Sequence, residues 1–296
     1  MFSATTSRLH GITSMLAAAL FFSGMDAILK LFAGHYPPMQ VSAMRGAASM
    51  PFILLPLVVT GRLRELRPVR WPLHLVRGAL GVGMLVAFVY AVRSLSLANA
   101  YAVFLVAPLL IAALSVPFLG EHVDFKRWLA ILIGLGGVLV MLRPSATGFI
   151  SIGALAALAA AVGYSCSAIV SRILLRTDTT ASLVFGFLLS LTVIAGLIAL
   201  PDWVALRRDD WGWLFGIGLL GALGQHFAID AFRHAPASVL APFEYTALLW
   251  GALIDWFAWH TLPSANVFVG GGIVVVTGVY LVRRENLAVA ALPASG

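Results

Sequence analysis

Three charged side chains lie within apolar stretches of the N-terminal sequence. Asp26 and Lys30 are spaced i, i+4 in MDAILKLF, and Arg45 lies in the next apolar stretch. This spacing places the acid and the amine on one helix face, with the acid N-terminal, as ion pairs favour. A guanidinium binds a carboxylate through two parallel hydrogen bonds. The three residues therefore predict one compensated cluster, which is either a structural clamp or a site of contact with a substrate.

A second polar group lies in the C-terminal half of the sequence. His226 and Asp230 share a helix face in GQHFAIDAFR, Arg233 follows one turn later, and Glu244 lies in the next apolar stretch. A histidine beside a carboxylate titrates in the physiological pH range. We expect His226 and Glu244 to be functional, with protons as a candidate coupling ion, and we interpret Asp230 and Arg233 as interfacial residues.

The amino-acid composition indicates whether these charged residues belong to a soluble protein or to a membrane protein. Hydrophobic residues make up 61% of the 296 positions, charged residues only 10%, and the mean hydropathy is +0.98. Soluble domains carry about 25% charged residues, so we predict an all-α integral membrane protein. The net charge of +7 comes from basic residues in short gaps, which argues against a nucleic-acid partner. The single cysteine, Cys166, excludes a disulfide framework and a cysteine-based metal site.

Apolar stretches of membrane-spanning length recur along the whole chain. A spanning helix needs about 20 mainly apolar residues. Lysine and arginine concentrate in alternate gaps, which predicts that both termini are cytoplasmic. In this arrangement Asp26 and Arg45 lie at about the same depth, whereas Lys30 is nearer the outer interface and either joins them or extends to that interface. About ten spans are predicted, near 11–33, 38–60, 73–94, 97–119, 127–143, 150–172, 180–200, 211–233, 237–259 and 265–282.

The two halves of the sequence repeat each other. ALFFSGMDAILKLF (19–32) is echoed by AVGYSCSAIVSRIL (161–174), and LANAYAVFLVAPLL (97–110) by HAPASVLAPFEYTA (234–247). We therefore predict two five-helix repeats, 1–146 and 147–296. Because five is odd, the second repeat is inverted in the membrane, and inverted repeats are typical of secondary transporters that hold substrate near the midplane.

Several of these stretches resemble the EamA branch of the drug/metabolite transporter superfamily. The resemblance covers ALFFSGMDAILKLF, VSAMRG, residues 98–123 with their central proline and terminal Gly-Glu, and APFEYTALLWGALIDW (241–256). The position matching Glu121 in the second half is Ala258, so the second Gly-Glu is missing. The resemblance implies a multi-pass carrier of the bacterial inner membrane. It also implies a central cavity lined by helices one, three, four, six, eight and nine.

Four tyrosines fall on helices that the resemblance assigns to the cavity wall. A buried tyrosine needs a partner for its hydroxyl, and a substrate can supply one. For each tyrosine, cavity lining and ordinary helix packing both remain open. The predicted substrate-binding set is Asp26, Arg45, Tyr90, Tyr101, Tyr164, His226, Glu244 and Tyr245.

Prolines and glycines predict where the bundle bends and where it packs tightly. Pro108 and Pro242 lie on the equivalent fourth and ninth spans and are predicted hinges, because proline removes a helix hydrogen bond. Glycine clusters at 134–137 and 270–272 predict close approach of the fifth and tenth spans. A homodimer contact at these glycines is a further candidate.

Three functional classes remain. A secondary carrier fits the inverted repeat and the polar groups inside the spans. An enzyme is not expected, because the sequence contains no H-E-x-x-H motif and no convincing Ser-His-Asp arrangement; we likewise expect no catalytic residue, metal site or cofactor. A channel more often shows rings of like residues. The expected substrate is a small molecule, an amino acid or a similar compound that is exported. Uptake of a larger metabolite such as S-adenosylmethionine or riboflavin is the alternative.

Overall fold

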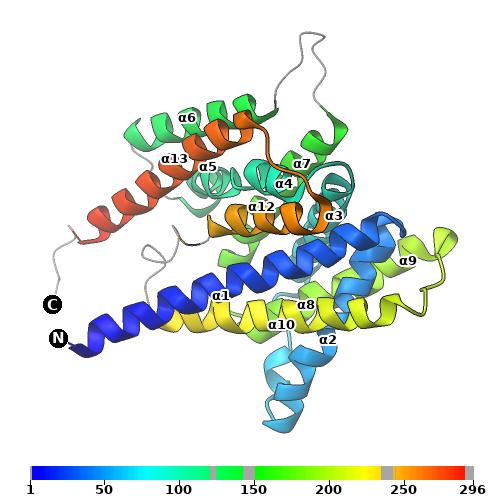
Figure 1. Cartoon of the computed structure of the whole chain (residues 1–296). Coiled ribbons are helices and arrows are strands. Elements are labelled where there is room, and N and C mark those ends of the chain that lie inside the picture. Colours follow the sequence, from blue (N-terminus) through cyan, green and yellow to red (C-terminus); the bar gives the residue numbers. More distant parts are fainter. Residues whose placement is uncertain (1, 121–124, 143–150, 235–242, 244, 291–296) are drawn as a thin grey trace.

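The chain folds into a bundle of helices. The computed structural model describes residues 2–120, 125–142, 151–234, 243 and 245–290, and within them all regular structure is helical (Figure 1). The helices are α1 (Phe2–Ala33), α2 (Pro38–Val59), η1 (Leu63–Leu66), α3 (Trp71–Ser94), α4 (Leu97–Phe104), α5 (Ala107–Leu119), α6 (Phe125–Leu142), α7 (Ile152–Leu174), α8 (Thr180–Ser190), η2 (Leu191–Ala195), α9 (Gly196–Ala199), η3 (Leu200–Asp202), α10 (Asp210–His234), α12 (Thr246–Trp259) and α13 (Ala265–Ala290).

Seven described helical segments are long and apolar enough to cross a membrane. Each lies on one of the predicted spans, and the all-α membrane class is confirmed. The seven are Leu9–Ala33, Pro38–Val59, Trp71–Ser94, Leu97–Leu119, Ile152–Leu174, Thr180–Asp202 and Asp210–Ala231; three shorter apolar helices are Trp128–Gly137, Thr246–Trp259 and Ala265–Tyr280.

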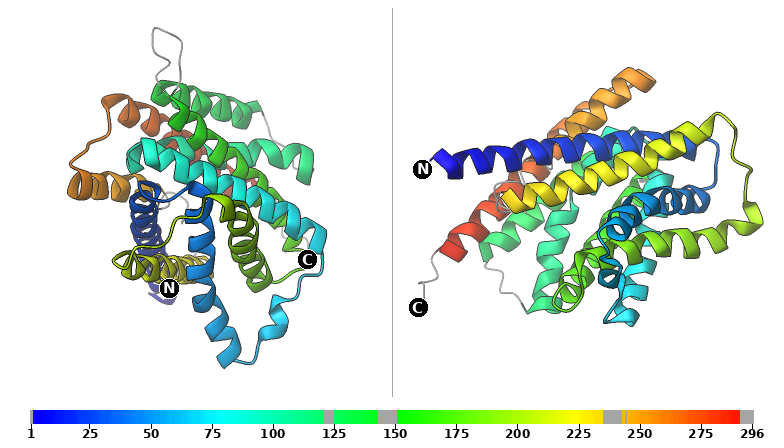
Figure 2. Two further views of the ribbon diagram at one scale, coloured as in Figure 1. Left: turned by 90° about the vertical axis from the view of Figure 1, so that its right-hand side faces the viewer. Right: turned by 90° about the horizontal axis from the view of Figure 1, so that it is seen from below.

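Helices that are far apart in the sequence pack side by side. α1 lies along α10, α3 along α7, and α6 along α13 (Figures 1 and 2). One apolar core, which includes Leu29, Val41, Leu85, Leu191 and Ile217, joins α1, α2, α3, η2 and α10. The N-terminal and C-terminal parts of the chain are therefore interleaved and share their core.

The fourth span is interrupted where the sequence predicts a bend. α4 ends at Phe104 and α5 begins at Ala107, with Pro108 as the second residue of α5. Proline has no amide hydrogen to donate and disfavours helical geometry in the residue before it. Movement at Pro108 stays a prediction, and Pro242 lies outside the described residues.

Hydrogen bonds between loops tie the two parts of the chain at both ends of the bundle. At one end the Asp178 carboxylate accepts from the Val69 amide at 2.7 Å and lies 2.9 Å from His74 Nε2. Burial acts to raise the pKa of Asp178, but hydrogen bonds from Thr177, the Val69 amide and His74 outweigh burial and lower the pKa to about 2. Asp178 is therefore charged at neutral pH.

A buried amide makes the equivalent connection at the other end. The Gln40 side chain is fully buried at the start of α2. Its Nε2 donates to the Val204 carbonyl at 2.6 Å, and its Oε1 accepts from the Val204 amide at 2.9 Å. Because both polar atoms of the amide are satisfied, the buried Gln40 carries little desolvation penalty.

A glycine allows the close approach of α6 and α13. A Cβ atom at Gly137 would lie 2.9 Å from the Gly270 carbonyl oxygen and 2.9 Å from Ile273 Cβ, whereas one at Gly136 would meet nothing within 4 Å. The predicted tight packing is confirmed at Gly137.

These two neighbouring glycines form a matched pair for mutation. We expect Gly137→Ala to destabilise the bundle by about 1–3 kcal/mol, because the new methyl group overpacks the α6–α13 contact. Gly136→Ala is expected to be neutral or slightly stabilising, since alanine is the better helix former. Thermal unfolding of the detergent-purified protein checks this, and equal effects of the two substitutions would contradict the packing.

Candidate functional site

Two adjoining cavities lie between the helices. The first has a volume of about 360 Å³ and is lined from α1, α4, α5, α7, α10 and α12. The second has a volume of about 450 Å³ and adds walls from α2, α3 and α8. Both cavities are lined by Phe22, Asp26, Tyr101, Phe104 and Tyr164, so together they form one chamber, which we call the central chamber.

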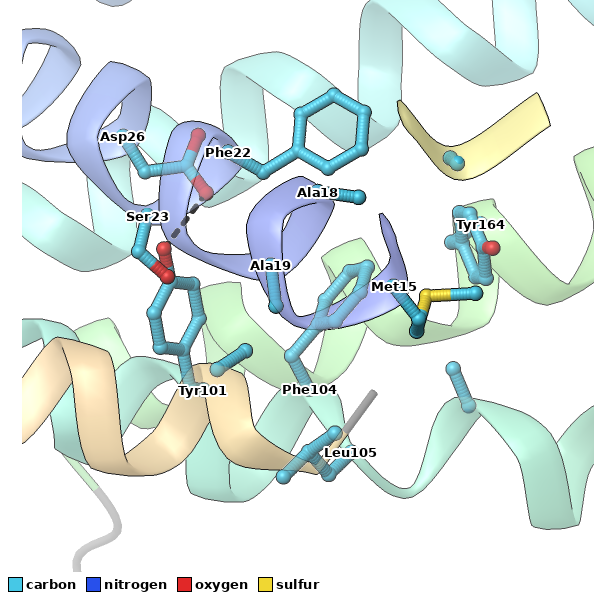
Figure 3. A pocket seen from close by; sticks show the side chains of 13 residues that line it. Met15, Ala18, Ala19, Phe22, Ser23, Asp26, Tyr101, Phe104, Leu105 and Tyr164 are labelled. Atoms are coloured by element: carbon cyan, nitrogen blue, oxygen red, sulfur yellow. Dashed lines mark hydrogen bonds between the residues drawn. The ribbon is translucent and has the colours of Figure 1, made fainter. Parts of the chain in front are cut away.

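Asp26 and Tyr101 form the polar contact at the junction of the two cavities. The Tyr101 hydroxyl donates to Asp26 Oδ2 at 2.8 Å (Figure 3). Asp26 comes from the C-terminal third of α1 and Tyr101 from α4, so this hydrogen bond links two walls of the chamber. Phe104 on α4 and Tyr164 on α7 add aromatic surface to the chamber, with their ring centroids 5.3 Å apart.

Arg45 reaches the same chamber from α2. It lines the second cavity and interacts electrostatically with Asp26 and Tyr101. Within the part of the chain that the structure describes, its guanidinium makes no hydrogen bond and no ion pair within 4 Å. The structure thus brings Asp26 and Arg45 to one cavity, as their equal depth predicts, and leaves the hydrogen-bond donors of Arg45 for water or a ligand.

A second guanidinium in the chamber was missed by sequence reasoning. Arg77 is the seventh residue of α3 and lines the second cavity. Its Nε donates to Ser171 Oγ at 2.6 Å and its Nη1 to the Leu183 carbonyl at 2.7 Å. The sequence signal for Arg77 was a charged residue less than two turns inside an apolar span. The basic segment at 62–70 comes just before this span and obscured that signal.

Lys30 does not belong to the Asp26 cluster. Its Nζ lies 2.6 Å from Asp255 Oδ1 on α12 and 4.1 Å from the centroid of the Trp259 ring. The other oxygen of Asp255 accepts from the Ala98 amide in the first turn of α4 at 2.9 Å. The prediction of a three-residue cluster is therefore wrong for Lys30, which joins α1 to α12 as a structural clamp.

The remaining predicted residues lie in different places. Tyr164 lines the central chamber, whereas Tyr90 lines a separate cavity beside Arg93. Tyr245 is buried, and its hydroxyl oxygen occupies the space that a Cβ atom would need if Gly278 were replaced. His226 is exposed on α10, away from the lining of both central cavities. Glu244 lies outside the described residues.

This architecture by itself defines a class of protein. Apolar helices of spanning length enclose a chamber with ionic and aromatic walls, as membrane carriers for small molecules do. The sequence model of the EamA-like transporter family matches residues 9–143 and again residues 151–284. The chain therefore belongs to the EamA-like transporter family, as its resemblance predicted, and it is a membrane transporter.

Characterised relatives differ in the molecule that they move. The chain is 29% identical to a pseudopaline exporter of Pseudomonas aeruginosa, covering 93% of this chain and 97% of that one. It is 27% identical to a riboflavin transporter of Vibrio cholerae, covering 94% of each. It is 25% identical to an S-adenosylmethionine uptake transporter of Rickettsia conorii, covering 97% of each.

A solved crystal structure has the same fold. It matches with a TM-score of 0.64 at 24% identity, covering 98% of this chain and 99% of the other. At this level of identity the likeness concerns the fold alone.

The Lys30–Asp255 clamp yields a prediction about stability. Asp255→Asn keeps an acceptor for the Ala98 amide but leaves the ammonium group without its counter-charge, so we expect a loss of about 3–5 kcal/mol. The double variant Lys30→Met/Asp255→Asn removes the unpaired charge and is expected to recover most of this loss. Thermal unfolding in detergent measures both variants.

An exposed ion pair supplies the control. Glu65→Gln breaks the surface pair Arg62–Glu65, whose side chains are 64% and 32% exposed, and is expected to cost at most about 1 kcal/mol. Lys30→Met alone completes the cycle, and a double variant whose loss equals the sum of the losses in Lys30→Met and Asp255→Asn would show that Lys30 and Asp255 are not coupled.

Proposed function

We propose that the chain is a secondary active carrier that exports a small amphiphilic metabolite, an amino acid or an amino-acid-like compound, across the bacterial inner membrane. The observation that carries this proposal is the central chamber, which presents two guanidinium groups and one carboxylate among aromatic side chains. An enzyme or a channel has no comparable support.

The charges of the chamber suit a zwitterion. Arg45 is the group best able to bind a substrate carboxylate, because its donors are not used by described residues and guanidinium binds carboxylates in bidentate geometry. Asp26 offers an acceptor for a substrate amine. Phe22, Phe88 and Phe104 give the apolar part of the substrate an apolar surface.

Alternating access is the proposed mechanism, with 1–146 and 147–296 as two inverted repeats and both termini cytoplasmic. The helix pairs support this proposal. If the two repeats are equivalent, α1 corresponds to α7 and α3 corresponds to α10. The counterpart of the α1–α10 contact is then the α7–α3 contact, and both of these helix pairs are closely packed. The two family matches, one in each half, point the same way. Inverted repeats can then rock about a central site.

The proposal also covers the direction of transport, the coupling ion and the assembly. Export is supported by the likeness to the pseudopaline exporter. Uptake of a larger metabolite is the second candidate, favoured by the S-adenosylmethionine and riboflavin relatives. We propose protons as the coupling ion, with Asp26 in the chamber and Glu244 as candidate carriers, and a homodimer through the α6–α13 surface as the assembly.

Reconstitution into liposomes tests the proposed function. With a panel of amino acids, S-adenosylmethionine and riboflavin, we expect amino-acid transport that a proton gradient accelerates in the parent and not in Asp26→Asn. We expect Arg45→Ala to raise KM by about 10- to 150-fold, since a hydrogen bond to a charged group contributes about 1.5–3 kcal/mol. Arg45→Lys keeps the charge and is expected to recover part of the affinity.

Stability measurements separate binding from scaffolding. Because Arg45 has no described hydrogen-bond partner, Arg45→Ala is expected to unfold at the parent's temperature or above it. Arg62→Ala, at an exposed arginine, is the control and leaves transport unchanged. Unchanged transport affinity in Arg45→Ala would assign Arg45 to the scaffold, and transport that ignores the proton gradient would remove proton coupling.

A further inference from the structure

Two histidines and an aspartate meet where α1 begins and α10 ends. His10 comes from α1, and Asp230 and His234 come from α10, so the first of them is 220 residues from the second in the sequence. One ring nitrogen from each histidine and one carboxylate oxygen all lie within 4.8 Å of one another. The ends of α1 and α10 lie side by side here (Figures 1 and 2).

The distances in this cluster match the spacing of metal ligands. His10 Nε2 lies 3.0 Å from Asp230 Oδ2. Ligand atoms of a tetrahedral zinc ion stand about 3.3 Å apart, because each bond is about 2.0–2.1 Å long. Small rotations of the side chains would therefore bring the three groups around one ion.

Neighbouring groups orient two of these ligands. Ser14 Oγ donates to Asp230 Oδ2 at 2.7 Å. His234 Nδ1 lies 2.8 Å from the Asp230 carbonyl oxygen, and a ring nitrogen that donates to a backbone carbonyl leaves the other nitrogen as a metal ligand. The side chains of His10, Asp230 and His234 are 55%, 24% and 37% exposed, so none of the three is sealed inside the bundle.

We propose that His10, Asp230 and His234 form a binding site for a divalent transition-metal ion. Two imidazoles and one carboxylate suit Zn²⁺, Co²⁺ or Ni²⁺, whereas Ca²⁺ and Mg²⁺ prefer sites built from oxygen atoms. Three protein ligands leave further coordination positions for water or another ligand. The sequence predicted no metal site. The three ligands of this site come from opposite parts of the chain, so no short motif contains them.

The position of this site gives the ion a mechanical consequence. Met15 and Ala228 line the first cavity, and they lie five and two residues from His10 and Asp230. An ion held by both helices fastens α1 to α10 at this end of the chamber. The bound ion therefore opposes any separation of α1 from α10 there and stabilises the folded bundle.

Metal titration of the purified full-length protein tests the site. We expect the parent, prepared with a tag free of histidine, to bind one equivalent of Co²⁺ with the visible absorption of a coordinated ion, and Zn²⁺ to displace it. His10→Ala and His234→Ala are each expected to weaken binding at least tenfold. Ser14→Ala is expected to weaken it about tenfold, the effect of losing an outer partner of a metal ligand.

The matched control is His226→Ala, which removes an exposed histidine of the same helix outside the cluster and should leave Co²⁺ affinity unchanged. Zn²⁺ should raise the unfolding temperature of the parent and of His226→Ala but not of His10→Ala. Where His10→Ala elutes as aggregate in size-exclusion chromatography, His10→Gln replaces it. No saturable Co²⁺ binding by the parent, or equal affinity in the parent, His10→Ala and His234→Ala, would overturn the proposal.

Discussion

The structure depends on how ionic side chains are compensated inside a bilayer. A charge in the middle of a membrane helix costs about 2.5–3.5 kcal/mol even on insertion scales. Lys30 is compensated within the protein, because Asp255 accepts its hydrogen bond and Trp259 covers its ammonium group. Arg45 is different, since no described residue accepts its hydrogen bonds. A guanidinium in that condition is tolerated where it lines a cavity that admits water or a substrate.

The arrangement of helices makes such a cavity possible. α1 with α10 and α3 with α7 form closely packed pairs that each join one half of the chain to the other. The chamber lies where these pairs meet, so its walls come from both halves. The Asp178 and Gln40 connections hold the loops at the two ends. Movement of one half against the other would therefore change access to the chamber without breaking any single helix.

Sequence reasoning succeeded for properties that depend on one helix at a time. Hydropathy located the seven long spans, Pro108 marked the break in the fourth span, and Asp26 and Arg45, counted at the same depth on two helices, line one cavity. It failed where lateral neighbours decide the outcome. The i, i+4 spacing of Asp26 and Lys30 describes one helix, whereas the actual partner of Lys30 is Asp255 on α12. Likewise α10 is apolar on most sides, so its sequence did not show that His226 faces outward.

Accessibility of the chamber to water is the most direct test of this account. Ser167 lines the second cavity on α7 and is 8% exposed, and the native chain has a single cysteine, Cys166. The measurement is the reaction of Ser167→Cys, in a Cys166→Ala background in proteoliposomes, with a membrane-impermeant maleimide; the Cys166→Ala parent gives the baseline. A thiolate forms in a wet, electropositive chamber and reacts, whereas a thiol sealed among apolar side chains is inert. The account predicts labelling of the folded protein, and labelling seen only after unfolding would contradict it.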